Sequence, residues 1–542
     1  MRLCEFVDKC LSDIGVDKVF GIPGALIMPV WQNITDKEIV LCSHEQEAAY
    51  VATGYAKMSR KPVCVITTGG PGVTNCISGV ASANVDSVPM ICISGRTPIS
   101  KNGFGLRQEE SHINRLYDST GILNEITKKS VCITSLDQAA EIIYYTMLQA
   151  VEGRKGAVHI SIPIDLQECE IRNWIPPKKT KCSSSKVTQV DFLKKPIFIV
   201  GWGCWMSNSY EAVYELAEMV NAPIVVTSKA YCCIKKNHDL YLGKLGYGYN
   251  KVIDDFIKEY NPDTIVAFGT SLGEKDIKES ILQDYIGKKR TYIIGDDCSI
   301  FDHRGMHVTK VETNDLYDYI QMIKQNTIIQ KMDKELYTRI FHAKINTRLY
   351  WQQKMLPEDD MAKTIWNIDL IRDMDMVITA DAGNHLANAG AVVEPLNFGR
   401  FFLDVGLRAM GNGICMTAGM AIADNSKTYI AITGDGCMLM NGNIMHLVYE
   451  RQLPIVFLVV NNHALGRVRV GQSISNDYRA TDIYHVDFMA YGKTFGLDTY
   501  RYQRVDDCIN EIMDIVKRRR PALVEIVTDH DEVPLIVKDN IY

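Results

Sequence analysis

The chain has 542 residues, of which 46% are hydrophobic and 23% are charged, and its formal net charge is −6. This composition is that of an ordinary folded protein, and the length predicts about three domains. The weak negative charge gives no basis for binding nucleic acid or a membrane surface, and no apolar run approaches the ~20 residues of a transmembrane helix. The 16 cysteines are scattered and the chain begins without a signal segment, so we expect a reduced, cytoplasmic protein.

Residues 1–175 alternate short apolar runs with amphipathic stretches and glycine-rich turns. This alternation predicts a parallel, doubly wound α/β sheet. The expected strands are 19–22, 39–42, 62–67 and 89–94. A helix follows the second strand, with Ser43 as its predicted N-cap and Glu45 in its first turn, where a carboxylate also interacts favourably with the helix dipole.

A polar stretch at 176–190, rich in serine, lysine and proline, predicts a linker. Four further apolar strands separated by helical stretches predict a second α/β domain over 190–330. Residues 330–365 are charged with a helical pattern and predict a connector. A third α/β unit follows, and its first strand, 376–380, ends at the sequence DAGNH.

The strongest pattern lies in this third unit. An apolar run ends at Gly434-Asp435-Gly436, an amphipathic helix is expected over Asn441–Gln452, and a second apolar run ends at Asn461-Asn462. The strands of such a β-α-β unit are parallel, so Asp435 and Asn462 follow strand ends at the edge where open α/β sheets bind ligands. A carboxylate and an amide oxygen there suit Mg²⁺, and the flanking glycines let backbone N–H groups approach a phosphate. A plain β-α-β unit with turn residues at its strand ends is the alternative.

This order of GDG, helix, strand and NN resembles the metal and diphosphate motif of thiamin diphosphate-dependent enzymes. The wording GDGCMLMNGN…LPIVFLVVNN is similar to the acetolactate (acetohydroxyacid) synthase branch. The resemblance implies three doubly wound parallel-sheet α/β domains: a pyrimidine-binding domain over 1–175, a central domain over 190–330 and a diphosphate-binding domain over 360–542. It also implies thiamin diphosphate and Mg²⁺ as cofactors. A homodimer or homotetramer is expected, because each site in this family lies between two subunits.

The resemblance further implies roles for single residues. Glu45 would hydrogen-bond the pyrimidine and activate the cofactor, with Glu47 as its solvated neighbour. Gln108, in RQEESH, would orient the substrate, and Met440 would hold the cofactor in its folded shape. The residues expected to bind the cofactor are Glu45, Asn384, His385, Met410, Gly436 and Cys437, and those expected to bind the metal are Asp435, Asn462 and, through its backbone oxygen, Ala464. Simpler alternatives are a helix-dipole carboxylate for Glu45, a polar loop for Gln108, and core or structural roles for Met440 and His385.

The chain also departs from the family pattern. The segment GTSLGEKD at 269–276 lacks the arginine and the Phe-Asp pair of the family's FAD segment, so FAD binding is doubtful. Arg107 and Arg467 replace apolar residues, and Gly471 replaces a tryptophan, near the expected mouth of the site. Together with Arg469 these changes predict an anionic acceptor, although each arginine also suits a solvated surface.

The reaction implied by the resemblance is decarboxylation of a 2-oxo acid, with pyruvate as the expected donor, and transfer of the remaining acyl unit to a second carbonyl compound. A non-oxidative 2-oxo acid decarboxylase or a lyase of the same superfamily is the first alternative. The paired histidines that pyruvate-type decarboxylases use are absent from the sequence. A cofactor-binding scaffold without catalysis is the second alternative, and the presence of Glu45, Asp435 and Asn462 argues against it. The expected partners are therefore small molecules, with neither nucleic acid nor membrane.

Overall fold

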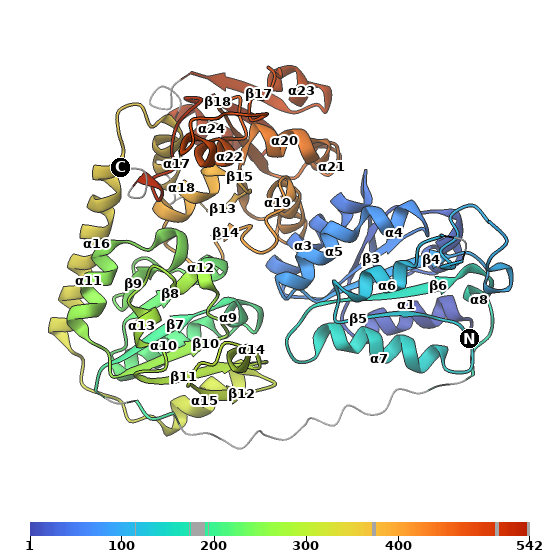
Figure 1. Ribbon diagram of the computed structural model, residues 1–542, viewed down its shortest axis with the longest axis horizontal. Coiled ribbons are helices and arrows are strands. Elements are labelled where there is room, and N and C mark those ends of the chain that lie inside the picture. The colour runs from blue at the N-terminus through green and yellow to red at the C-terminus, as the bar shows by residue number, and fades with distance from the viewer. Residues whose placement is uncertain are drawn as a thin grey trace. The chain divides into compact units, whose positions relative to one another are not determined.

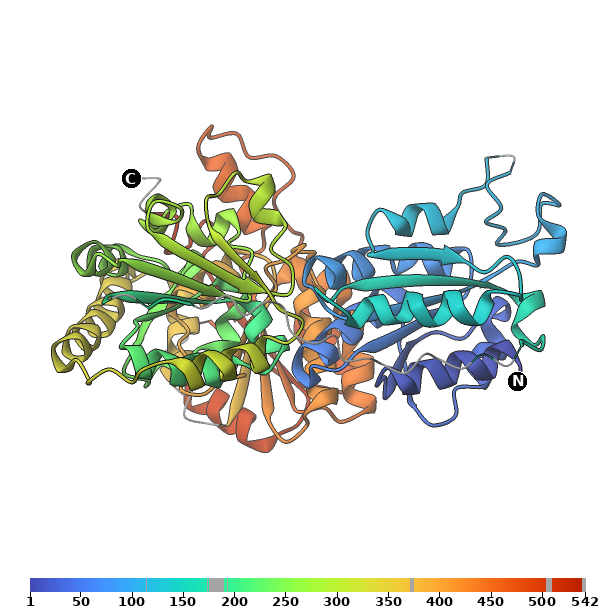
Figure 2. The same ribbon diagram turned by 90° about the horizontal axis from the view of Figure 1, so that it is seen from below.

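The structure is a computed structural model that describes residues 1–113, 115–172, 174, 190–192, 194–370, 375–503 and 509–538. Nearly all of the linker predicted at 176–190 lies outside the described residues. The described chain contains three six-stranded sheets whose recorded strand pairs are parallel (Figures 1 and 2). Helices lie on both faces of the sheets, so the predicted fold class of doubly wound α/β sheets is confirmed.

By internal packing the chain divides into two compact units. The first unit consists of residues 1–181, 406–426 and 440–455, and the second unit consists of residues 182–405, 427–439 and 456–542. The second unit therefore contains two of the three sheets. The domain boundaries expected from the sequence stay predictions.

The sheet of the first unit has the strand order β2-β1-β3-β4-β6-β5. Its strands are β1 (Lys18–Gly21), β2 (Glu38–Leu41), β3 (Val63–Thr67), β4 (Met90–Arg96), β5 (Lys129–Cys132) and β6 (Ala157–Pro163). Its helices are α1 (Leu3–Asp13), α2 (Met28–Gln32), α3 (Glu45–Ser59), α4 (Pro71–Asn75), α5 (Ile77–Val85), α6 (Ser119–Asn124), α7 (Ala139–Val151), α8 (Ile164–Gln167), α19 (Asn412–Ala423) and α21 (Met445–Glu450). The apolar sides of α1 and α7 form one core with the sheet, and α3 packs against α5 (Figure 1).

Helix α3, which begins at Glu45, is fixed along its length by α19. A Cβ on Gly54 would lie 1.9 Å from the carbonyl oxygen of Met416, and a Cβ on Gly419 would lie 1.8 Å from that of Val51. Only glycine therefore allows the two helices to approach so closely. The N-cap of α3 is His44, whose Nδ1 accepts the N–H of Gln46 at 3.1 Å, so the prediction of Ser43 as the cap is wrong by one residue.

The first sheet of the second unit has the order β12-β11-β10-β7-β8-β9. Its strands are β7 (Pro196–Val200), β8 (Ile224–Val226), β9 (Tyr241–Lys244), β10 (Thr264–Phe268), β11 (Arg290–Gly295) and β12 (Thr309–Glu312). Its helices are α9 (Trp202–Met206), α10 (Tyr210–Val220), α11 (Lys251–Tyr260), α12 (Glu274–Ile277), α13 (Leu282–Tyr285), α14 (Ile300–His303) and α15 (Leu316–Asn326), and the connector is α16 (Lys334–Lys354). The four predicted strands correspond to β7, β8, β10 and β11, and the edge strands β9 and β12 add to them.

The second sheet of the second unit has the order β14-β13-β15-β16-β18-β17. Its strands are β13 (Met376–Ala380), β14 (Phe401–Leu403), β15 (Thr428–Gly434), β16 (Ile455–Asn461), β17 (Asp498–Tyr502) and β18 (Ala522–Val527), and its helices are α17 (Asp360–Leu370), α18 (Asn384–Val392), α20 (Asp435–Asn441), α22 (Gly466–Ser473), α23 (Phe488–Thr494) and α24 (Ile509–Arg518). The chain leaves β13 toward one edge of the sheet and returns on the other side as β15. Ligands bind at such switch points, outside the carboxyl ends of the strands.

The helix predicted over Asn441–Gln452 differs from the observed one. Helix α20 begins at Asp435 itself, directly after β15, and a 3₁₀ turn at Gly442–Ile444 separates it from α21. Gly434 is therefore the last residue of the strand, Asp435 and Gly436 begin the helix, and no separate loop lies between them. Among the residues that the structure describes, every helix is too short or too polar to cross a membrane.

Candidate active site

Asp435 is the carboxylate at the carboxyl end of β15. Its side chain is buried, Oδ1 accepts the N–H of Gly436 at 2.7 Å, and Oδ2 accepts the N–H of Ala464 at 3.1 Å. Burial raises the pKa of this carboxyl to about 6. A bound cation would favour the ionised form, because it supplies the opposite charge that the site lacks.

Ala464 lies opposite Asp482 in a short antiparallel pair. The flanking hydrogen bonds run from the N–H of Leu465 to the oxygen of Thr481 at 2.7 Å and from the N–H of Ile483 to the oxygen of His463 at 2.8 Å. In this pattern the N–H and C=O of the central residue point away from its partner strand. The N–H of Ala464 points to Asp435, so its carbonyl faces the same side, where it also accepts the N–H of Gly466 at 2.8 Å.

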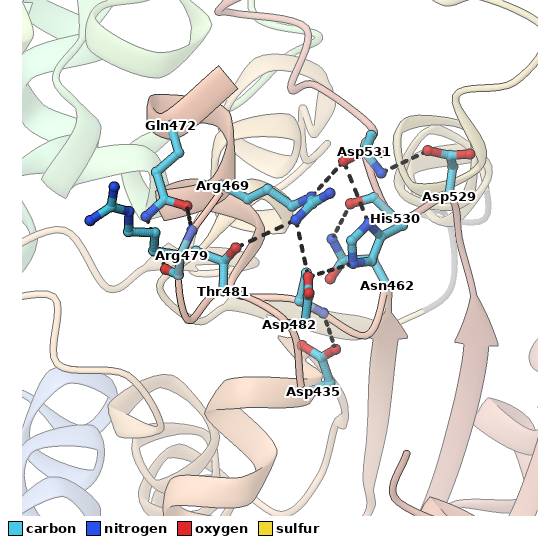
Figure 3. A network of polar contacts seen from close by, with 11 residues as sticks. Asp435, Asn462, Arg469, Gln472, Arg479, Thr481, Asp482, Asp529, His530 and Asp531 are labelled. Carbon is cyan, nitrogen blue, oxygen red and sulfur yellow. Dashed lines mark hydrogen bonds and ion pairs between the residues drawn. The ribbon is translucent and has the colours of Figure 1, made fainter. Parts of the chain in front are cut away.

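Asn462 follows the end of β16 and adds an amide. Its Nδ2 donates to the backbone oxygen of His530 at 3.2 Å, which leaves Oδ1 as an acceptor (Figure 3). The three residues expected to bind the metal thus lie on adjacent loops and offer a carboxylate, an amide oxygen and a backbone carbonyl. These are hard oxygen donors of the kind that Mg²⁺ prefers. Within the described ranges there is no group of three or more His, Cys, Asp and Glu that could hold a metal ion.

Asn384 and His385 open α18 at the carboxyl end of the neighbouring strand β13. Both are buried, and Oδ1 of Asn384 and Nε2 of His385 have no hydrogen-bond partner. Burial lowers the pKa of His385 to about 4, so its imidazole is neutral. Buried polar atoms without partners are rare in proteins, and at a helix N-terminus they fit a polar ligand.

Glycines leave the space between these side chains. A Cβ on Gly466 would lie 2.8 Å from Nδ2 of Asn384 and 2.9 Å from Nδ2 of Asn462. A Cβ on Gly434 would lie 3.0 Å from the His385 ring. The two amides thus lie close to Gly466, and the imidazole lies close to Gly434, the residue before Asp435. Gly436 and Cys437 form the first turn of α20 at this edge, where Cys437 Sγ also contacts the carbonyl of Ala382 at 3.0 Å.

In the first unit, Glu45 and Gln108 gather around the turn GGPGVTN. Oε2 of Glu45 accepts the amide of Asn75 at 3.0 Å, and a Cβ on Gly72 would lie 3.5 Å from its Oε1. Gln108 has a positive φ of 64° and packs on Gly70. A Cβ added to Gly70 would lie 2.9 Å from the Cβ of Gln108. The structure therefore brings both predicted residues to the carboxyl end of β3.

Three family models match the chain in order. They are those of the N-terminal TPP binding domain of thiamine pyrophosphate enzymes (residues 1–118), their central domain (residues 189–297) and their C-terminal TPP binding domain (residues 381–526). Together the matches cover more than half of the chain. The chain belongs to the thiamine pyrophosphate enzyme family.

Relatives place this thiamine pyrophosphate enzyme in the acetolactate synthase-like branch. The large subunit of acetolactate synthase isozyme 1 of Escherichia coli is 28% identical, over 97% of this chain and 94% of that protein. A probable acetolactate synthase large subunit of Methanocaldococcus jannaschii is 26% identical, over 99% and 93%. The large subunit of isozyme 2 of Escherichia coli is 27% identical, over 98% and 96%.

Glu47 of this thiamine pyrophosphate enzyme is not solvated, which corrects the sequence-based expectation. It is completely buried, and its carboxylate accepts the N–H of Ser43 at 3.0 Å and the amide of Asn443 at 2.9 Å. Burial raises its pKa to about 7. The only sequence signal for this burial is the run Ala48, Ala49 and Tyr50 that follows Glu47, and it does not reveal Asn443 as the partner.

Met410 and Met440 lie in the first unit. Met410 is half-buried just before α19, whereas the side chain of Met440 is 57% exposed near the end of α20. The roles expected for both methionines stay predictions. Gln108 likewise has the position but not the proven role of a substrate contact.

The arginines expected to bind an anion behave differently from one another. Arg469 is already neutralised, because Nε donates to Asp531 at 2.5 Å and Nη1 donates to Asp482 at 3.0 Å. These ion pairs argue against a role of Arg469 in binding an acceptor. Arg107 and Arg467 are exposed.

The turn that follows β7 in the central sheet is closely packed. The N–H of Gly203, which follows β7, donates to the carbonyl of Gly269 at 2.8 Å. A Cβ on Gly201 would lie 2.4 Å from the same carbonyl oxygen. The backbone of the loop after β10 thus packs directly on the turn that follows β7, and the doubt about FAD binding stays a prediction.

Proposed function

We propose that this enzyme binds thiamin diphosphate with Mg²⁺, decarboxylates pyruvate and transfers the remaining acyl unit to a second carbonyl compound. The observation that carries the proposal is the set of oxygen donors at Asp435, Asn462 and Ala464, beside the unpaired polar atoms of Asn384 and His385. This set occurs in a chain that resembles acetolactate synthase large subunits over nearly its whole length.

In this proposal the carboxylate of Asp435 and the oxygens of Asn462 and Ala464 would hold the cation, and these three donors are fewer than the six that Mg²⁺ takes, which would leave room for oxygens of the diphosphate and of water. Nε2 of His385, which has no partner in the protein, would pair with a diphosphate oxygen once it carries a proton, whereas Oδ1 of Asn384 is an acceptor that would face a water molecule on the cation. Gly436 and Cys437 add the first turn of α20, whose N-terminal end favours a negative charge.

When bound, thiamin diphosphate supplies the electron sink that lets a 2-oxo acid lose carbon dioxide. Glu45 holds a proton at the pyrimidine ring, and its position is set by the hydrogen bond from Asn75 and by the packing of α3 on α19. Gln108 orients the donor, and Met440 supports the folded cofactor. We place the pyrimidine-binding domain at 1–175, the central domain at 190–330 and the diphosphate-binding domain at 360–542, in a homodimer or homotetramer.

Besides pyruvate, the site in this proposal also admits an acceptor that is larger or more strongly anionic. Gly471 stands where the family has a tryptophan, and no atom lies within 4 Å of the position its Cβ would take. Arg467 is exposed and lies on α22, the helix that also contains Gly471. Open space and a guanidinium suit a carboxylate or a phosphorylated sugar. FAD plays no part in the proposal.

Product analysis tests the proposal. Protein freed of metal with EDTA is incubated with pyruvate, then with thiamin diphosphate and Mg²⁺ added separately and together, and the products are identified by NMR. Acetolactate that forms only with both additions supports the synthase. Acetaldehyde as the sole product would move the assignment to a decarboxylase. If pyruvate is not consumed, the same assay is repeated with other 2-oxo acids and with phosphorylated aldehydes as acceptors.

A further inference from the structure

Arg469 is the centre of a polar network beside the metal-binding loops (Figure 3). It lies on α22, and its side chain is only 13% exposed. Its guanidinium is 2.5 Å from Asp531 and 3.0 Å from Asp482, and it stacks on the ring of Tyr478 at 4.1 Å. One side chain thus joins three segments: α22, the loop around residue 482 and the turn that follows β18.

The contact between Arg469 and Asp482 leads to Ala464. Asp482 lies directly opposite Ala464 in the antiparallel pair, whose two hydrogen bonds fix the direction of the Ala464 carbonyl. Thr481, the neighbour of Asp482, accepts the N–H of Leu465 and is itself buried. By fixing Asp482, Arg469 therefore also fixes the segment that pairs with Ala464 and sets the direction of its backbone oxygen.

The contact between Arg469 and Asp531 leads to Asn462. The carbonyl of His530 accepts the Asn462 amide at 3.2 Å, so it decides which way the amide oxygen points. The imidazole of His530 is 3.1 Å from Asp482 and 3.5 Å from Asp531, the two carboxylates that Arg469 joins. Asp531 is further fixed by its N–H, which donates to Asp529 at 2.8 Å.

We propose that Arg469 is a positioning residue for the cation, because it clamps from outside both segments that orient the oxygens of Asn462 and Ala464. The inference rests on the proposed function, since it assumes that these oxygens bind Mg²⁺. Outer-shell groups of this kind alter metal affinity without touching the metal.

The chemistry of arginine suits this role. Its planar fork presents several N–H donors in a fixed geometry, so one guanidinium can bridge Asp482 and Asp531. Without it, two like charges and the imidazole would remain, and the carboxylates would repel each other. A lysine at this position offers a point charge and cannot hold both carboxylates in the same fixed geometry.

The test uses Mn²⁺ as the probe, because its binding is read by electron paramagnetic resonance without any turnover. The full-length protein is titrated with Mn²⁺ in the presence of thiamin diphosphate as wild type, Arg469→Met and Arg469→Lys. We expect the dissociation constant of Mn²⁺ to rise about tenfold or more in Arg469→Met and less in Arg469→Lys. The melting temperature of the protein free of metal and cofactor is measured alongside, and we expect it to change little, because the partner carboxylates Asp482 and Asp531 are mostly exposed.

Arg479→Met is the matched control. Arg479 belongs to the loop around residue 482, but its side chain is 79% exposed and pairs with Asp477. Its Mn²⁺ affinity should stay within about twofold of the wild type. Asp482→Asn is the second variant, used if Arg469→Met does not fold. It should weaken Mn²⁺ binding in the same direction, because it loosens the residue opposite Ala464.

The outcomes separate this inference from the proposed function. If Asp435→Asn loses Mn²⁺ while Arg469→Met and Asp482→Asn bind it like the wild type, the metal site stands and the role of Arg469 is refuted. If the wild type binds no more Mn²⁺ than Asp435→Asn, the metal site of the proposed function fails, and the inference fails with it. Activity gives a further readout, since excess Mg²⁺ should restore kcat in Arg469→Met.

Discussion

The backbone N–H of Ala464 donates a hydrogen bond of 3.1 Å to Oδ2 of Asp435. This bond joins the loop that follows β16 to the first turn of α20. Because Ala464 pairs with Asp482 on its other side, its carbonyl faces Asp435 as well. A single residue therefore orients the carboxylate and adds a second oxygen donor next to it.

Asp435→Asn should weaken the binding of thiamin diphosphate in the presence of Mg²⁺ by about 100-fold or more. Asparagine keeps the size of the side chain but removes the negative charge of this buried carboxylate, which the cation would meet. Isothermal titration calorimetry measures the effect, with Asp477→Asn as a control at the surface. Equal affinity of Asp435→Asn and the wild type would refute the metal site.

Gly466→Ala should raise the dissociation constant of thiamin diphosphate about tenfold. The new Cβ would lie 2.8 Å from the Asn384 amide and 2.9 Å from the Asn462 amide, so both side chains must move. Gly471→Ala, on the same helix, is the control, because its Cβ has no atom within 4 Å. The account of the site would be contradicted if both variants bound the cofactor equally well.

Glu47→Gln should change how stability depends on pH. Burial raises the pKa of Glu47 from 4.5 to about 7, so between these values the folded protein binds more protons than the unfolded chain. The free energy of unfolding therefore falls as the pH rises through this window, by roughly 3 kcal/mol from this group. Relative to the wild type, Glu47→Gln should be more stable at pH 8 than at pH 5 by about this amount. Urea unfolding of both proteins at the two pH values measures the difference, and parallel pH profiles would show that Glu47 is not buried in its neutral form.

Arg467→Glu should raise the KM for an anionic acceptor about tenfold and leave the KM for the donor nearly unchanged. The charge reversal replaces attraction by repulsion at an exposed position on α22. Steady-state kinetics with the acceptor identified by the product assay gives both values. An unchanged acceptor KM would remove Arg467 from the account.

The parts of the site that the sequence predicted are those set by local geometry. Asp435 and Asn462 follow the ends of neighbouring parallel strands, and such ends meet at one edge of the sheet whatever the rest of the chain does. The strands themselves follow from short apolar runs between turn residues, and β13 has the predicted bounds. The sequence did not predict that a helix begins at Asp435, because two glycines around an aspartate are typical of a turn.

The misjudged residues are those whose partners lie far along the chain. Arg469 pairs with Asp482 and Asp531, which are 13 and 62 residues away. Glu47 receives a hydrogen bond from Asn443, which is 396 residues away. No periodicity or motif encodes such partners, so a charged side chain in the sequence is taken as solvated until the fold shows otherwise.

The central claim, a thiamin diphosphate-dependent carboligase activated by Glu45, is tested most directly by the rate of acetolactate formation from pyruvate in Glu45→Gln, compared with the wild type and Glu47→Gln. Thiamin diphosphate and Mg²⁺ are kept saturating, and binding is checked by calorimetry. The account predicts that Glu45→Gln binds the cofactor but forms acetolactate at least about 100-fold more slowly, whereas Glu47→Gln stays close to the wild type. Equal rates in Glu45→Gln and the wild type would contradict it.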